Sequence, residues 1–266
     1  MRLESLQKHV SNMKIHHFRN ATMVIEANNH FILVDPMLGP KGSLPPFTFF
    51  RFKPVKNPIV ELPEISKTFL DKITHCVITH NHPDHIDKPA EDFLKEKNIP
   101  VFCSVKDEKT FSKKGLNIVK TIEYWTKSEF LGGSIEGIPA QHGYGFVAKP
   151  AGNVMGFFIQ LSHQPSIYLS SDTIYTDAVD RVFRDYKPEV SIVAAGSAQF
   201  DIFKPLLMTM DDILKFAKNA PGKVIANHME AVNHCPTKRS TLRTNITELS
   251  LLEKVFIPED GETLTF

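Results

Sequence analysis

Residues 73–87 read ITHCVITHNHPDHID, in which a β-branched run leads directly into a dense group of histidine and aspartate side chains. The length and β-branched content of residues 73–79 predict a short buried strand. His80 and His82 follow this strand. Residues two apart in an extended segment point the same way, so these two imidazoles can bind one cation together.

The second half of the motif adds a carboxylate and a third imidazole. Pro83 bends the chain, so that Asp84 and His85 can turn toward a second cation. The alternative is a solvated strand-to-helix loop in which Asp84 or Asp87 caps the next helix. An HxH pair alone would favour that loop, whereas the full HxHxDH pattern favours a metal site. Imidazole and carboxylate ligands suit zinc, manganese or iron.

Short apolar and β-branched runs recur along the chain and alternate with stretches of helical pattern. The opening runs form a hairpin that turns at Asn28-Asn29. The predicted strands are 14–17, 22–27, 30–34, 73–79, 100–105, 117–123, 130–138, 154–161, 166–170, 189–195 and 223–227, and the predicted helices are 64–71, 88–97, 175–186, 209–219 and 239–253. Strands followed by alternating strands and helices, twice over, predict a mixed α/β architecture. No linker divides the halves, so we expect a single domain over residues 1–266.

The segment 36–63 interrupts this pattern with seven prolines and the aromatic side chains Phe47, Phe49, Phe50 and Phe52. Proline at this density prevents regular structure. Long loops inside compact domains are commonly functional lids or disordered segments. The aromatic content favours a packed lid that shapes a pocket; an ordinary surface loop or an oligomer contact is the alternative.

The bulk composition limits the classes of protein to consider. The chain has 31 Lys and Arg against 30 Asp and Glu, so it lacks the basic surplus expected of a nucleic-acid-binding protein. Cys76, Cys103 and Cys235 are an odd number without CxxC spacing, which argues against a disulfide framework. The N-terminus lacks the apolar core of a signal peptide, and no run approaches the roughly 18 apolar residues of a membrane span. We therefore expect a cytoplasmic protein without a membrane partner.

The segment HNHPDH at 80–85 matches the HxHxDH signature of the metallo-β-lactamase superfamily, which the chain resembles over residues 14–235. The resemblance is greatest to the branch with ascorbate-6-phosphate lactonase-like proteins. It rests further on Asp35 in LVDP, His142 in AQHGYG, Asp172 in YLSSDT and His228 in IANHME. It implies an α/β fold that is a four-layer αββα sandwich, in which helices flank two mixed sheets.

The resemblance also implies a site for two divalent metal ions, with zinc first and manganese or iron as alternatives. A hydroxide between the metals would be the nucleophile, and Asp84 would in addition receive or deliver a proton. The implied ligands are His80, His82 and His142 for the first metal, Asp84, His85 and His228 for the second, and Asp172 as the bridge between them.

Two further residues belong to this expected site. His228 and His234 compete for the last ligand position, and we favour His228 because it directly follows the predicted strand 223–227. His234 would then lie near the mouth of the site and orient a ligand or contact the substrate. Asp35 is expected close to the metals.

The resemblance implies a metal-dependent hydrolase that acts on a small ester, lactone or phosphoester. Lys204, Lys238 and Arg239 could bind an anionic substrate group. Two alternatives remain open: a phosphodiesterase or nuclease acting on nucleic acid with the same metals, and a metal-binding scaffold without catalysis. Whether the chain forms a homo-oligomer is not decided by the sequence.

Overall fold

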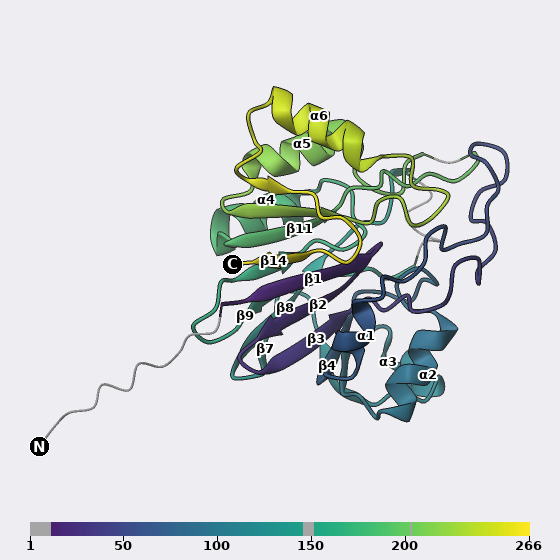
Figure 1. Ribbon diagram of the computed structural model, residues 1–266. Coiled ribbons are helices and arrows are strands. Elements are labelled where there is room, and N and C mark those ends of the chain that lie inside the picture. Colours follow the sequence, from purple (N-terminus) through teal and green to yellow (C-terminus); the bar gives the residue numbers. More distant parts are fainter. Residues whose placement is uncertain (1–11, 146–151, 203) are drawn as a thin grey trace, which may run out of the picture.

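The computed structural model describes residues 12–145, 152–202 and 204–266, and Figure 1 shows two β-sheets packed face to face with helices on both outer sides. Residues 1–11, on which the expectation about a signal peptide rests, lie outside the described residues. Among the described residues, no helix is long and apolar enough to cross a membrane. The arrangement confirms the expected four-layer sandwich with two mixed sheets.

The two sheets contain seven strands each. The strands are β1 Lys14–Arg19, β2 Thr22–Ala27, β3 His30–Val34, β4 His75–Ile78, β5 Val101–Ser104, β6 Ile118–Ile122, β7 Lys127–Phe130, β8 Gly133–Pro139, β9 Met155–Gln160, β10 Ile167–Leu169, β11 Val190–Ala194, β12 Lys223–Asn227, β13 Val255–Phe256 and β14 Thr263–Thr265.

Each sheet combines an antiparallel half with a parallel half. The first has the order β14-β1-β2-β3-β4-β5-β6 and is antiparallel from β14 to β3, then parallel from β3 to β6. The second has the order β13-β12-β11-β10-β9-β8-β7 and is antiparallel from β7 to β10, then parallel from β10 to β13. Both halves of the chain therefore build the same kind of mixed sheet.

Helices cover the outer face of each sheet. They are α1 Ser66–Leu70, α2 Lys88–Glu96, α3 Glu108–Lys113, α4 Asp177–Arg181, the single π-helical turn η2 Val182–Tyr186, α5 Met210–Asn219 and α6 Arg239–Glu248. In Figure 1, α1 to α3 lie on the side of the first sheet and α4 to α6 on the side of the second. Asp87 caps α2 by accepting a hydrogen bond from the Ala90 backbone N–H, and Thr209 caps α5 by accepting one from the Asp212 backbone N–H.

Most predicted elements are present, and the exceptions have local causes. The predicted strand 130–138 corresponds mainly to β8, but its predicted start is three residues too early: Leu131 and Gly132 have positive φ and form the turn between β7 and β8. Helix α3 was not predicted because Phe111 is its only buried residue, which gives no periodic apolar face. The predicted helix 239–253 ends at Glu248, and the two-residue strand β13 follows.

Three apolar interfaces hold the four layers together. The largest lies between the sheets and includes Ile25 and Val34 from the first sheet and Phe157 and Ile192 from the second. The other two lie beneath the helices on each outer face. Burial of apolar surface is the main stabilising term for such layers.

The segment 36–63 packs against the body of the protein without forming a helix or a strand. A buried Arg19 at the end of β1 anchors it: the guanidinium donates hydrogen bonds to the carbonyls of Met37, Gly39 and Val60. An irregular segment has carbonyls that no helix or sheet satisfies, and Arg19 supplies their donors.

We expect Arg19→Met to lower the free energy of unfolding by about 3 kcal/mol, because it leaves buried carbonyls without donors. Urea denaturation of the wild type and the variant measures the difference. Lys14→Met is the matched control on the same strand, since the Lys14 side chain is 43% exposed. A loss below about 1 kcal/mol for Arg19→Met would contradict the anchoring role.

Candidate metal centre

The candidate centre lies where strands of both sheets end. Asp35 follows β3, His80 follows β4 after Thr79, and Asp172 comes shortly after β10. His142 comes shortly after β8 and His228 directly after β12. The fold therefore gathers residues that are far apart in the sequence at one edge of the sandwich, on rigid elements of both sheets.

All seven predicted ligands lie in three overlapping groups, within each of which the ligand atoms are within 4.8 Å of one another. His80 belongs to two groups, as does His85, so the three groups form one continuous cluster. The groups are His80, His82 and His142; His80, His85 and Asp172; and Asp84, His85 and His228.

Asp172 lies between the two ends of this cluster. Its Oδ2 atom is 3.3 Å from His85 Nε2, 3.5 Å from His228 Nε2 and 3.7 Å from His142 Nε2. Its other oxygen, Oδ1, is buried and has no hydrogen-bond partner among the described residues. This position fits the bridging role that the sequence led us to expect.

Four of the histidines are oriented by a contact to Nδ1, which leaves Nε2 for the cluster. His80 Nδ1 lies 2.9 Å from Thr79 Oγ1, and His142 Nδ1 lies 3.0 Å from the Leu206 carbonyl. His85 Nδ1 is 2.9 Å from Asp35 Oδ2, and His228 Nδ1 is 3.5 Å from Cys235 Sγ. Partners of this kind fix ring orientation and raise ligand basicity at metal sites.

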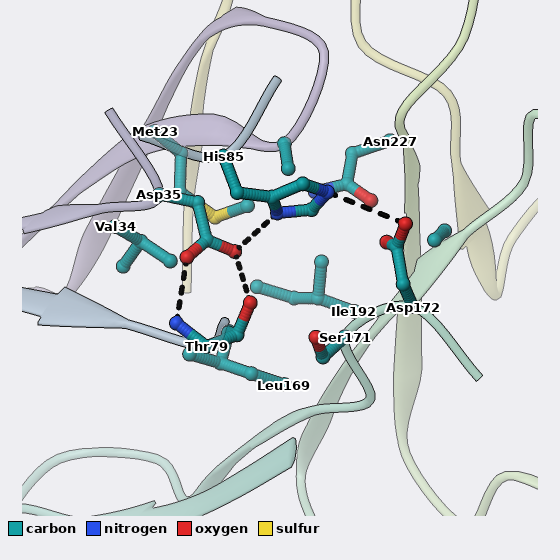
Figure 2. A pocket seen from close by; sticks show the side chains of 12 residues that line it. Met23, Val34, Asp35, Thr79, His85, Leu169, Ser171, Asp172, Ile192 and Asn227 are labelled. Carbon is teal, nitrogen blue, oxygen red and sulfur yellow. Dashed lines mark hydrogen bonds and ion pairs between the residues drawn. The ribbon is translucent and has the colours of Figure 1, made fainter. Parts of the chain in front are cut away.

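Asp35 is the best-defined of these orienting groups (Figure 2). Its carboxylate accepts hydrogen bonds from the Thr79 amide and the Thr79 hydroxyl, both at 2.8 Å, besides facing His85. The side chains of Met23, Val34 and other apolar residues surround the pair and shield it from solvent. Asp35 therefore links the end of β4 to the HxHxDH motif.

The donor set fits divalent cations. His85 Nε2 and His228 Nε2 lie only 3.0 Å apart, a distance at which two ring lone pairs repel unless a proton or a cation lies between them. His80 Nε2 is buried without a hydrogen-bond partner in the described part of the chain. Buried polar atoms normally have partners, so a cluster of such atoms on imidazole and carboxylate groups is suited to a metal.

Burial and mutual attraction shift the protonation of the whole cluster. Burial alone would raise the pKa of Asp84 and of Asp172, but neighbouring histidines outweigh it and hold both pKa values well below the usual carboxyl range. Burial would lower the pKa of His85, but Asp172, Asp35 and Asp84 raise it to about 10. The metal-free cluster therefore keeps a proton at neutral pH, which a metal must displace on binding.

The backbone is strained at several points of the centre. Asp35, Ser171 and His228 have φ of 44°, 58° and 60°. Such values are rare for residues other than glycine and cluster at functional sites. Gly196 is required beside His228, since a Cβ on Gly196 would lie 2.2 Å from the His228 carbonyl oxygen.

The structure separates the two histidines that competed for the last ligand position. His228 lies in a group with Asp84 and His85, whereas His234 is in none of the three groups. His234 is buried nearby, and its desolvation lowers its pKa to about 4. The orienting partners Thr79, Leu206 and Cys235 were missed by sequence reasoning; only Thr79, adjacent to the motif, gave a local signal.

We expect Asp35→Asn to weaken the affinity for zinc by about 10- to 100-fold, because His85 loses its anionic partner. Competition with a fluorescent zinc chelator measures this affinity. Asp107→Asn is the control, since Asp107 is a buried carboxylate bonded to Asn153 and belongs to none of the ligand groups. An unchanged affinity in Asp35→Asn would show that Asp35 does not support the cluster.

Comparison with known proteins identifies the family of the chain. Residues 30–229 match the family model described as a beta-lactamase superfamily domain. The chain is 33% identical over 257 residues to the UPF0173 protein YddR of Bacillus subtilis (strain 168), covering 96% of this chain and all of that protein.

Two solved structures are similar over 96% of this chain. A possible metal-dependent hydrolase from Veillonella parvula has 31% sequence identity and a TM-score of 0.89, with its whole chain covered. An isothiocyanate hydrolase from Delia radicum gut bacteria has 28% identity and a TM-score of 0.87, with 99% of its chain covered. Together with the clustered ligands, these matches establish that the chain belongs to the beta-lactamase superfamily and is a metal-dependent hydrolase.

Proposed function

We propose that this hydrolase holds two divalent metal ions, most suitably zinc, and hydrolyses a small ester, a lactone or a related substrate. The position of Asp172 carries the proposal: one carboxylate lies beside His85, His228 and His142, which belong to different ends of the ligand cluster. A carboxylate that lies between two sets of ligands is suited to bridge two metal ions.

In this proposal the first ion is held by the imidazoles of His80, His82 and His142. The second is held by Asp84, His85 and His228. Ions bound there supply an activated water at neutral pH and polarise the bond to be broken. His and carboxylate ligands also accept manganese and iron.

The chain itself contributes orientation and proton handling. The Asp35–His85 contact and the other Nδ1 partners fix the imidazole rings before substrate binds. His85 and His228 hold the pKa of Asp84 well below the usual carboxyl range, so its carboxylate is ionised at neutral pH and able to bind a cation. We propose in addition that Asp84 receives or delivers a proton during hydrolysis.

Two observations favour a carbon electrophile over a phosphoester as the substrate. Arg239, which we had considered for anion binding, is buried and already bound to Glu230, Asp260 and the Pro258 carbonyl. The similar isothiocyanate hydrolase acts on an electrophilic carbon by its name, and water attacks an ester or lactone carbonyl in a comparable way. We therefore place esters, lactones and isothiocyanates first among the substrates to test.

We expect the wild type to bind about two equivalents of metal and His82→Ala to bind fewer, with hydrolysis reduced by about 100-fold or more. Plasma mass spectrometry measures the metal. Hydrolysis is assayed with 4-nitrophenyl acetate, δ-valerolactone, phenethyl isothiocyanate and bis(4-nitrophenyl) phosphate, before and after chelation and with zinc, manganese or iron added back.

His163→Ala is the control, because His163 is exposed and lies in the turn between β9 and β10. It should retain wild-type metal content and hydrolysis. Wild-type protein that binds no metal after reconstitution, or hydrolysis that survives complete chelation, would refute the proposed function.

A further inference from the structure

His234 lies outside the metal groups, yet it is held in a defined aromatic environment. It is buried, with 6% of its surface exposed. The Phe47 ring meets it edge-on, with centroids 5.2 Å apart and an interplanar angle of 88°. The Phe200 ring stacks on it at 5.7 Å and 16°. Two phenylalanine rings from separate loops therefore pack against one imidazole.

The polar atoms of this imidazole are not used by the protein. His234 Nδ1 is buried and has no hydrogen-bond partner among the described residues. A neutral imidazole always carries one N–H donor and one acceptor nitrogen. Leaving such a buried group unpaired costs stability, which indicates that it serves a molecule bound at the site.

His234 lies near the ligand cluster. It directly precedes Cys235, whose Sγ atom is 3.5 Å from Nδ1 of the predicted ligand His228. A molecule that contacts His234 is therefore close to the predicted metal ligands.

Asn233 ties the Phe47 segment to the His234 loop. Its Oδ1 atom accepts hydrogen bonds from the Phe47 amide at 2.9 Å and from Asn57 Nδ2 at 3.1 Å. The Asn233 backbone N–H donates a hydrogen bond to Asn57 Oδ1 at 2.8 Å, and Asn233 Nδ2 donates one to the Thr48 carbonyl at 3.0 Å. The Phe47 ring is therefore positioned by hydrogen bonds to its segment as well as by apolar packing.

Asp201 ties the Phe47 segment to the Phe200 loop. Its carboxylate accepts hydrogen bonds from the Thr48 hydroxyl and from the amides of Phe49, Phe50 and Arg51. The Gln199 backbone N–H donates a hydrogen bond to the His234 carbonyl at 2.9 Å, which joins the Phe200 loop to the His234 loop. Three segments distant in sequence are therefore locked around one imidazole, as in a preorganised binding site.

Two charged groups of these segments are already bonded within the protein. The Arg51 side chain donates hydrogen bonds to Gln199 Oε1 and to the Asp201 carbonyl. The Asp201 carboxylate accepts the hydrogen bonds described above. The immediate walls around His234 are aromatic, which suits an uncharged group.

We propose that Phe47, Phe200 and His234 form the subsite that selects the substrate, and that the substrate is an uncharged molecule with an aromatic or alkyl substituent. The substituent packs against the two phenylalanine rings, and the His234 imidazole hydrogen-bonds a polar atom next to the bond that is hydrolysed. This inference rests on the proposed hydrolase function and names its substrate class.

The test measures binding of an uncharged, non-hydrolysed probe, 3-phenylpropanamide, to the zinc-loaded protein by isothermal titration calorimetry. Propanamide, which lacks the ring, is the reference ligand. We expect 3-phenylpropanamide to bind at least about fivefold more tightly than propanamide to the wild type. Phe47→Ala and Phe200→Ala should remove most of that difference.

His234→Phe tests the hydrogen bond separately, because it keeps an aromatic ring between Phe47 and Phe200 but has no ring nitrogen. It should weaken 3-phenylpropanamide binding by about fivefold or more, and His234→Gln should recover part of the loss. Zinc content should stay at the wild-type value in each variant. Phe256→Ala and His163→Phe are the matched controls and should bind the probe as the wild type does.

Any of four results would overturn the subsite. Unchanged probe binding in Phe47→Ala, Phe200→Ala and His234→Phe, with metal and hydrolysis intact, would reject it while leaving the proposed function standing. Loss of zinc from His234→Phe would make His234 a metal ligand instead. A wild type that hydrolyses bis(4-nitrophenyl) phosphate in preference to 4-nitrophenyl acetate would contradict an uncharged substrate. A wild type without metal or hydrolysis would refute the proposed function and, with it, this inference.

Discussion

The contact between the Asp35 carboxylate and His85 Nδ1 is the constraint on which the centre depends. Asp35 directly follows β3, and its carboxylate also accepts two hydrogen bonds from Thr79, which directly follows β4. The same carboxylate therefore sets the register of two neighbouring strands at their ends and the direction of one imidazole. Because the group is buried, its interactions act in a low dielectric and are strong. The metal motif is oriented by the sheet beneath it.

Strained backbone accompanies this constraint at the centre. Asp35 and His228 both adopt positive φ at the point where a strand ends and a functional side chain begins. Each costs about 1–3 kcal/mol, and the apolar interfaces between and outside the sheets supply the stability that offsets it. The sandwich thus serves as a rigid frame that holds imidazoles and carboxylates closer together than they would settle in solution.

The family resemblance implied the sandwich and the ligand set, and local signals in the sequence supported part of both. The β-branched strand before His80 and the ligand density after it are visible within a few residues, and His228 directly follows a clear apolar strand. Two of the orienting partners were not predictable from the sequence: the Leu206 carbonyl carries no residue-type signal, and Cys235 gives only the signal of an ordinary buried thiol. The aromatic contacts of His234 were also not predictable, because Phe47 and Phe200 are far from each other in the sequence and only the fold brings both rings to His234.

The predicted metal ligands and the residues around His234 are held by different parts of the structure. The ligand side chains follow strand ends, whereas Phe47 and Phe200 sit on irregular segments whose contacts run through Asn233 and Asp201. A change of sequence in those loops can reshape the wall around the substrate without moving His80 or His85. Loops on a rigid scaffold are where recognition most readily varies. The same arrangement of imidazoles and carboxylates can therefore serve different substrates in related chains, and in this chain the choice falls to the residues around His234.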